Sequence, residues 1–280
     1  MKHILIPTDF SSNANHAISY ALRLFKCERT NFYFVRAYAD EVYSPFHNVD
    51  NDSFEDEKQA IEKSSENKLS KLVKEIKERT QNPKHHYETI TSFKSLVDAV
   101  KNIVNIKNID LTIMGTKGKT ASSKITFGSN TIQVFKYVKC PVLAIPDGYA
   151  YSQPKKILFP SDYMLPYRRE LKILDMLAAQ FKAKIFSFYI SDFEDLSLRQ
   201  LVNKKFLKES LLNAILSFVI KPAENRAKAI MTYIKDNSID LLVMVNSRHL
   251  FLEEMLYRST IDEIGLTSKV PFLVIQNLPR

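Results

Sequence analysis

The amino-acid sequence predicts an α/β protein built as two tandem doubly wound domains. Each domain is expected to hold a mostly parallel five-stranded sheet, in the strand order 3-2-1-4-5, with helices on both faces. Two observations predict this architecture. Short apolar runs alternate with segments of helical periodicity along the chain, and the second half repeats motifs of the first in the same order.

In each half, short apolar runs bounded by turn residues predict the strands, and segments with apolar residues at helical spacing predict the helices. In the first half we expect strands at residues 4–6, 32–35, 87–91, 111–114 and 142–145, and helices at 11–25, 55–76 and 95–104. In the second half we expect strands at 157–159, 185–190, 218–220, 241–245 and 272–275, and a helix at 201–216.

Three pairs of similar segments reveal the repeat: residues 2–10 with 155–163, 109–114 with 239–244, and 141–145 with 271–275. The last two pairs share an offset of 130, whereas the first pair has an offset of 153. The first half therefore carries about 23 extra residues, which we expect in the polar stretch 40–65. The repeat predicts one domain at residues 1–148 and a second at 153–280, with the seam at 147–154.

The composition is that of an ordinary globular chain, with 45% apolar and 25% charged residues. No apolar stretch is long enough to span a membrane, and the N-terminus lacks a signal-peptide pattern. Two cysteines, Cys27 and Cys140, are too few for a disulfide framework, so we expect a cytoplasmic location. The net charge of +9 is spread over both halves without a long basic run, which argues against a nucleic-acid partner.

Three of the five glycines, Gly115, Gly118 and Gly128, lie between the fourth predicted strand and the helix that follows it. Glycine is favoured where the backbone needs a positive φ or approaches another group closely. In a 3-2-1-4-5 sheet this junction lies beside Asp9, which follows the first strand, at the reversal of strand order where such folds bind ligands. The first two glycines could turn backbone N–H groups toward an anion, and Asp9 suits ribose hydroxyls. A nucleoside phosphate accounts for both features.

The next helix is expected to begin with Gly128, Ser129 and Asn130, and its N-terminus offers unpaired N–H donors. Ser129 either caps this helix or donates its hydroxyl group to a phosphate. The alternatives are that the glycines mark ordinary turns and that Asp9 is a turn or capping residue. Three lysines near the loop either screen phosphate charge or are merely solvated: Lys117, Lys119 and Lys124.

The spacing Gly-x2-Gly-x9-Gly-Ser, with Pro-Thr-Asp closing the first strand, resembles the ATP-binding branch of the universal stress protein family. The resemblance covers the chain as a tandem of two family domains. It implies a regulatory role in stress tolerance with ATP or AMP as the bound nucleotide and Mg²⁺ as an optional companion. It also implies pairing of the two halves as a pseudo-dimer through their last strands, and it leaves a homodimer open.

By position, the resemblance implies that Asp9, with Thr8 beside it, and the backbone of Ala37 contact ribose and adenine. The residues implied for ribose and phosphates are Met114, Gly115, Gly118, Gly128, Ser129 and Asn130. Asn130 stands where an apolar residue is common in the family, but a backbone contact would survive this difference.

The second half lacks the glycine motif. At the offset of 130, the three glycines become Val245, Arg248 and Arg258, and only Asp162 and Ser259 remain. Valine disfavours a positive φ, and the arginine side chains occupy space that a pyrophosphate would need, so we expect no nucleotide there. The two arginines either fill the empty crevice or hold a smaller anion.

Two other classes of function stay open. A slow ATP hydrolase needs a residue that positions water and a divalent ion, and Asp9 is the only evident acid. An interaction module would use the two repeats without any ligand. We identify no catalytic residues, no Gly-x4-Gly-Lys phosphate loop and no metal site; His85 and His86 are adjacent on a predicted strand and should face opposite ways.

Overall fold

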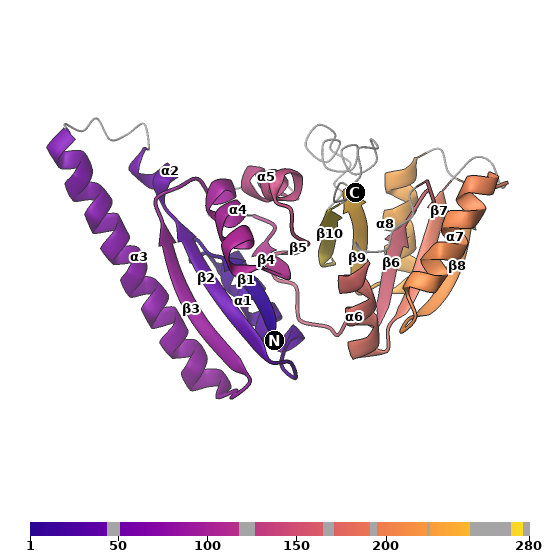
Figure 1. Ribbon diagram of the computed structural model, residues 1–280, viewed down its shortest axis with the longest axis horizontal. Helices are drawn as coiled ribbons and strands as arrows, with labels where there is room; N and C mark the ends of the chain where they lie inside the picture. Colours follow the sequence, from indigo (N-terminus) through magenta and orange to yellow (C-terminus); the bar gives the residue numbers. More distant parts are fainter. Residues whose placement is uncertain are drawn as a thin grey trace. The chain divides into compact units, whose positions relative to one another are not determined.

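The computed structural model describes residues 1–43, 51–117, 127–164, 171–190, 195–222, 225–246 and 270–276. The chain divides into two compact units, one of Met1–Ala121 with Gly128–Val142 and one of Ser122–Phe127 with Leu143–Arg280 (Figure 1). Within the described ranges, no helix is long and apolar enough to cross a membrane.

The first half alternates strands and helices as predicted. Its elements are β1 (Lys2–Pro7), α1 (Ser12–Leu24), β2 (Thr30–Ala37), α2 (Ala39–Val42), α3 (Asn51–Thr80), β3 (His85–Ser92), α4 (Leu96–Lys107), β4 (Leu111–Gly115), α5 (Ser129–Tyr137) and β5 (Val142–Ile145). Its strands lie in the order β3-β2-β1-β4-β5, and β1 pairs in parallel with both β2 and β4. The predicted order 3-2-1-4-5 is therefore confirmed in this half.

The second half follows the same plan. Its elements are β6 (Lys156–Pro160), α6 (Lys172–Phe181), β7 (Lys184–Ile190), α7 (Leu198–Ser210), β8 (Ile215–Lys221), α8 (Arg226–Asn237), β9 (Leu241–Asn246) and β10 (Phe272–Gln276). Its strands lie in the order β10-β9-β6-β7-β8, which again reads 3-2-1-4-5 when they are numbered within this half. The pairs β6–β7, β7–β8, β6–β9 and β9–β10 are all parallel.

The predicted helix at 201–216 is wrong at its C-terminal end. The helix α7 ends at Ser210, and β8 begins at Ile215, which lies opposite Lys184 of β7. Apolar residues continue from the helix into the strand, and over so short a stretch helical and strand periods cannot be separated. Pairing with β7, a tertiary contact, determines where the strand begins.

The helix α1 illustrates how the sequence forms these layers. Ser11 has an extended backbone, and its Oγ accepts a hydrogen bond from the Ala14 backbone N–H at 3.2 Å, which caps the helix. Along the helix, Ala17, Ala21 and Leu24 are spaced to share one face and are fully buried. The strand β1 is buried over its last four residues, so the core of the first half lies between helix and sheet.

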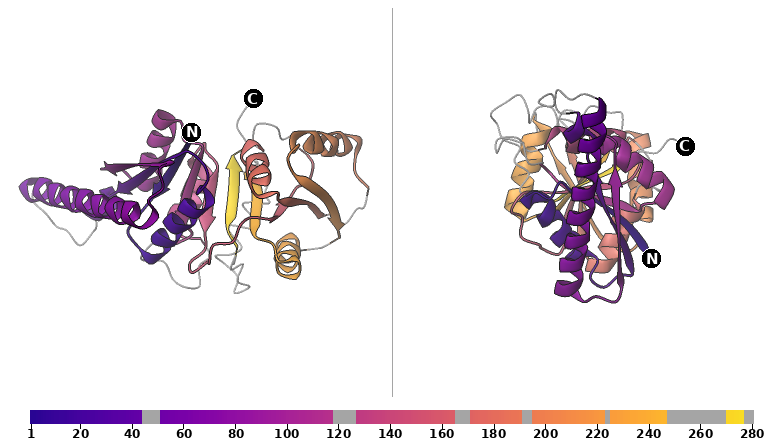
Figure 2. Two further views of the ribbon diagram at one scale, coloured as in Figure 1. Left: turned by 90° about the horizontal axis from the view of Figure 1, so that it is seen from below. Right: turned by 90° about the vertical axis from the view of Figure 1, so that its left-hand side faces the viewer.

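The extra residues of the first half lie where they were expected. Between its second and third strands the first half has 47 residues and the second half has 24, a difference of 23. In the first half this segment contains α2 and the 30-residue α3, whereas α7 has 13 residues. Figure 2 shows α3 as a long rod in the first unit, where it contacts β3 and buries Leu69 and Ile76.

Backbone details recur at equivalent positions of the two halves. Phe10 and Tyr163 follow the first strand of their half with φ of 61° and 55°. Asn108 and Ser238 end α4 and α8 with φ of 48° and 51°. Positive φ is uncommon for residues other than glycine, so its recurrence at these positions supports two copies of one architecture.

Candidate functional site

The turn between β1 and α1 presents Asp9. The Oδ1 atom of Asp9 accepts a hydrogen bond from the Ser11 N–H at 2.9 Å, and Thr8 Oγ1 accepts one from the Phe10 N–H at 3.0 Å. Ser11 in turn caps α1, so Asp9 is a turn residue rather than the cap itself. The bond from Ser11 orients the carboxylate of Asp9 at the end of β1, and the bond to Thr8 supports the same turn.

The junction between β4 and α5 is fixed by hydrogen bonds at the C-terminal end of β4. The Gly128 N–H donates to the Thr116 carbonyl oxygen at 2.8 Å. The buried hydroxyl group of Thr131 lies 3.2 Å from the Gly115 carbonyl oxygen and 3.0 Å from that of Thr116, and it donates there. The first turn of α5 is thereby tied to the last residue of β4.

These two junctions lie at the same edge of the sheet. The strands β1 and β4 are parallel neighbours, with Ile4 opposite Leu111 and Leu5 opposite Thr112, and α1 contacts β4. The carboxyl ends of β1 and β4 therefore lie side by side. As the sequence predicted, this brings Asp9, just after β1, and Gly115, at the end of β4, to the same edge of the sheet.

The glycines act differently from a positive-φ turn. Gly128 has φ of −65°, and Gly115 is the last residue of a strand, so neither uses the left-handed region. Gly115 instead serves close approach, because a β-carbon there would lie 1.7 Å from the side-chain oxygen of Asn13. Of the two reasons for glycine considered from the sequence, close approach is the one that applies at Gly115.

Among the described residues, no side chain caps the N-terminus of α5. Gly128 is the N-cap residue and has no side chain to accept a bond, so of the two roles considered for Ser129 the capping role does not apply. Ser129 and Asn130 occupy the first two helical positions and are exposed. The first turn carries no acidic residue and the last turn carries Lys136. Backbone N–H groups at such an end, together with the helix dipole, favour an anion.

Ala37, the last residue of β2, lies next to an aromatic cluster, which we define as Tyr38, Tyr43, Phe54 and Phe93. The ring centroids of Tyr38 and Phe93 are 5.6 Å apart. Burial, followed by a hydrogen bond to Glu62, raises the pKa of Tyr38 to about 12, so its hydroxyl group stays neutral. Tyr38 is buried, whereas Tyr43 is exposed, and an exposed aromatic face suits contact with a flat ligand.

Several predicted site residues lie outside the described residues: Gly118, Lys119, Lys124, Arg248, Arg258 and Ser259. Met114, by contrast, is a buried residue of β4.

Two residues of this site, Asn13 and Thr131, were not singled out from the sequence. A polar residue at the start of a helix carries no special signal in a single sequence, because helix N-termini commonly hold such residues.

The second half keeps the turn but not the glycine. Asp162 Oδ1 accepts a hydrogen bond from the Met164 N–H at 2.9 Å, which matches the turn at Asp9. Val245 stands in β9 at the position equivalent to Gly115 and is buried. A branched side chain therefore stands where the first half has glycine, at the position that the Asn13 side chain approaches.

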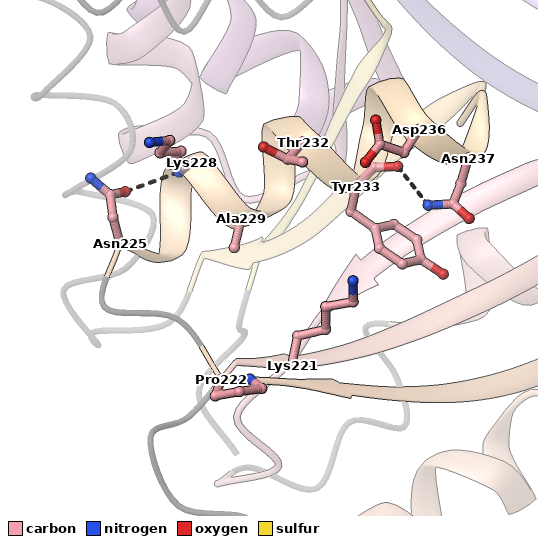
Figure 3. A pocket seen from close by; sticks show the side chains of 9 residues that line it. All are labelled: Lys221, Pro222, Asn225, Lys228, Ala229, Thr232, Tyr233, Asp236 and Asn237. Carbon is pink, nitrogen blue, oxygen red and sulfur yellow. Dashed lines mark hydrogen bonds between the residues drawn. The ribbon is translucent and has the colours of Figure 1, made fainter.

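A separate pocket of about 680 Å³ lies between the end of β8 and α8 (Figure 3). Lys221 and Tyr233 extend into the space between strand and helix. The Oδ1 atom of Asn225 accepts a hydrogen bond from the Lys228 N–H at 2.9 Å. The lining includes none of the sequence-predicted site residues: Lys221, Pro222, Asn225, Lys228, Ala229, Thr232, Tyr233, Asp236 and Asn237.

The adjacent histidines of β3 face opposite ways, as expected. His85 is buried, whereas His86 is exposed. Burial lowers the pKa of His85, and its Nε2 lies 3.0 Å from the Phe25 carbonyl oxygen. His85 is therefore a core residue with a satisfied ring nitrogen.

Comparison with known proteins places the first half in a family. The model of the universal stress protein family matches residues 1–146. Universal stress protein MJ0531 of Methanocaldococcus jannaschii is 30% identical over 156 residues, which cover 55% of this chain and 84% of that protein.

Two solved structures share the fold over nearly the whole chain. A universal stress protein from Archaeoglobus fulgidus aligns with a TM-score of 0.67 at 18% identity and covers 98% of this chain and 96% of its own. A putative universal stress protein from Pseudomonas aeruginosa aligns with a TM-score of 0.56 at 13% identity and covers 99% and 93%.

Proposed function

Since this chain belongs to the universal stress protein family, we propose that its first half binds one adenine nucleotide, ATP or AMP. The nucleotide would lie at the carboxyl ends of β1 and β4. We further propose that its binding regulates the stability of the protein or its contacts with partners, in the reducing setting of the cytoplasm.

The parallel pairing of β1 with β4 is the observation that carries this proposal. It brings an oriented carboxylate, Asp9, to the same edge as the N-terminus of α5, which no described side chain caps. A carboxylate accepts hydrogen bonds from ribose hydroxyls, and a helix N-terminus attracts phosphates. One ligand that carries both groups, a nucleoside phosphate, satisfies both ends of this arrangement.

The adenine base would lie near the backbone of Ala37, beside the aromatic cluster, with Thr8 next to the ribose. The phosphates would lie near Gly128, Ser129 and Asn130. We propose that Mg²⁺, where present, accompanies the phosphates, because the described residues hold no group of three or more His, Cys, Asp or Glu side chains suited to a metal ion.

One nucleotide per chain is expected, because Val245 replaces Gly115 in the second half. The pairing of the two halves as a pseudo-dimer, and any homodimer, stay predictions that analytical ultracentrifugation can test. A slow ATP hydrolase is not favoured by a specific observation.

Isothermal titration calorimetry with ATP and AMP tests the proposal on a matched pair of variants, Asp9→Ala and Asp162→Ala. In each half the carboxylate that is removed accepts a hydrogen bond, 2.9 Å long, from the backbone N–H of the residue two positions later in the chain. The loss of turn stability should therefore be similar. We expect one site per chain, weakened at least about tenfold by Asp9→Ala and unchanged by Asp162→Ala.

Equal effects of the two substitutions would contradict a site in the first half. If the wild-type protein binds neither nucleotide, the proposal fails and the interaction-module hypothesis takes its place.

A further inference from the structure

Asn13 lies in the first turn of α1, against the end of β4. It is 5% exposed, and neither its Nδ2 nor its Oδ1 has a hydrogen-bond partner. Buried side-chain amides usually satisfy both atoms, and an unsatisfied one costs folding free energy. An amide left without partners at this place therefore calls for a functional explanation.

Asn31 shows the contrast within the same half. This residue is also buried, but its Nδ2 donates to Tyr33 Oη and to Glu88 Oε1, each at 2.8 Å. Both amide donors of Asn31 are therefore satisfied, and only its Oδ1 has no hydrogen-bond partner. Among the residues that the structure describes, nothing accepts a hydrogen bond from Asn13.

The surroundings of Asn13 point to the chemistry that would satisfy it. Its Oδ1 faces Gly115, where the lack of a β-carbon leaves room for the oxygen. The carbonyl group of Gly115 is in turn bonded by Thr131 in the first turn of α5. The amide therefore contacts the residue to which the first turn of α5 is bonded, and both of its polar atoms lack a partner, so Nδ2 needs an acceptor. An anionic oxygen beside a helix N-terminus is such an acceptor.

The second half has lost both members of this contact. At the offsets of its own segments, Asn13 becomes Pro166 and Gly115 becomes Val245. Neither proline nor valine has a side-chain donor. The half in which the glycine motif is missing is therefore also the half without the amide.

We propose that Asn13 is a ligand-binding residue whose Nδ2 donates to a phosphate oxygen of the nucleotide held by the first half. The inference rests on the nucleotide site proposed above and adds a side-chain donor from α1 to it. Because both amide atoms are covered in the ligand-free protein, binding includes a rotation of this side chain away from Gly115.

Calorimetric titration with ATP, AMP and adenosine tests this role on Asn13→Ala, with Asn15→Ala as the matched control. Asn15 lies on the same helix but is exposed. We expect Asn13→Ala to weaken ATP and AMP binding at least about tenfold and to leave adenosine binding unchanged. Asn15→Ala should change none of the three affinities.

The melting temperature of the ligand-free protein separates this role from a structural one. Removal of an unsatisfied buried amide should leave that temperature unchanged or raise it. Asn13→Leu, which is similar in size and has no polar atom, should show the same loss for phosphate-bearing ligands if Asn13→Ala does not fold.

An equal loss for ATP and adenosine, or a lower melting temperature with unchanged affinity ratios, would overturn the role of Asn13. If the wild-type protein binds ATP and both variants bind it equally well, only this inference fails. If the wild-type protein binds no adenine nucleotide, the proposed function fails as well.

Discussion

The side-chain oxygen of Asn13 lies where residue 115 would place its β-carbon, with 1.7 Å between Oδ1 and an ideal Cβ on Gly115. Although these two residues are 102 positions apart in the chain, the position of the Asn13 side chain requires a residue without a β-carbon at position 115. The first helix approaches the end of β4 this closely only because position 115 is glycine.

Gly115→Ala should lower the free energy of unfolding by about 1–3 kcal/mol, because the new methyl group overpacks a buried contact. Adding Asn13→Ala removes the clashing oxygen, so the double variant should recover part of the loss. Urea denaturation of both single variants and the double variant measures the coupling, which we expect to exceed about 0.5 kcal/mol. Strict additivity of the two changes would show that the contact is unimportant.

Thr131→Val should lower the free energy of unfolding by about 1–2 kcal/mol, because two buried carbonyl groups lose their shared donor. The variant should also weaken ATP binding, since the first turn of α5 is no longer tied to Gly115 and Thr116. Thr131→Ser keeps the hydroxyl group and serves as the control. The prediction fails if the two variants unfold at the same urea concentration.

His85 should make stability fall as the pH drops below 6.5. Burial lowers its pKa in the folded state from the ordinary value of 6.5, so the unfolded chain takes up the proton first. The loss begins near pH 6.5, continues down to the folded-state pKa and then levels off, with a slope of up to about 1.4 kcal/mol per pH unit.

Urea denaturation measures the contribution of His85. The measurements should run from pH 7.5 to 5, a range of about 2.5 units that includes the ordinary histidine pKa. His85→Gln should flatten the pH dependence of the free energy of unfolding. The control is His86→Gln, which changes the exposed neighbour and should leave that dependence as it is. Equal flattening by both substitutions would rule out burial as the cause.

The two cysteines should differ in reactivity. Cys140 is buried, and burial raises the pKa of its thiol to about 12, whereas Cys27 is exposed. Because the thiolate is the reactive form, a colorimetric disulfide reagent should modify one thiol in the native protein and both in urea. Cys27→Ser should abolish the native reaction. Rapid modification of this variant without denaturant would show that Cys140 is accessible.

Most of the fold could be predicted from short apolar runs and from the repeat of sequence motifs between the two halves. Apolar runs identified the ten strands of the described residues. The change of offset between 153 and 130 gave the number of extra residues, 23, and the polar stretch 40–65 pointed to the interval between β2 and β3. The end of α7 was not predictable, because apolar residues run on from Ser210 toward Ile215 and only pairing with β7 makes them a strand.

The candidate site was predictable where chain order alone fixes position. Asp9 and Gly115 follow strands that a 3-2-1-4-5 order makes neighbours, and the structure brings both to one edge. The sequence left two roles open for Ser129. The structure removes the capping role, because the N-cap residue of α5 is Gly128, whose N–H donates to the Thr116 carbonyl oxygen.

The sequence by itself determined the alternation of strands and helices, the repeat and the presence of an intact glycine motif in one half only. These properties reside in periodicity and spacing, which a chain carries before it folds. Only the tertiary structure decided why Gly115 is glycine, that Thr131 ties α5 to β4 and that the amide of Asn13 is left without partners. Such contacts join side chains far apart in sequence, and close packing of helix against sheet determines which of them meet.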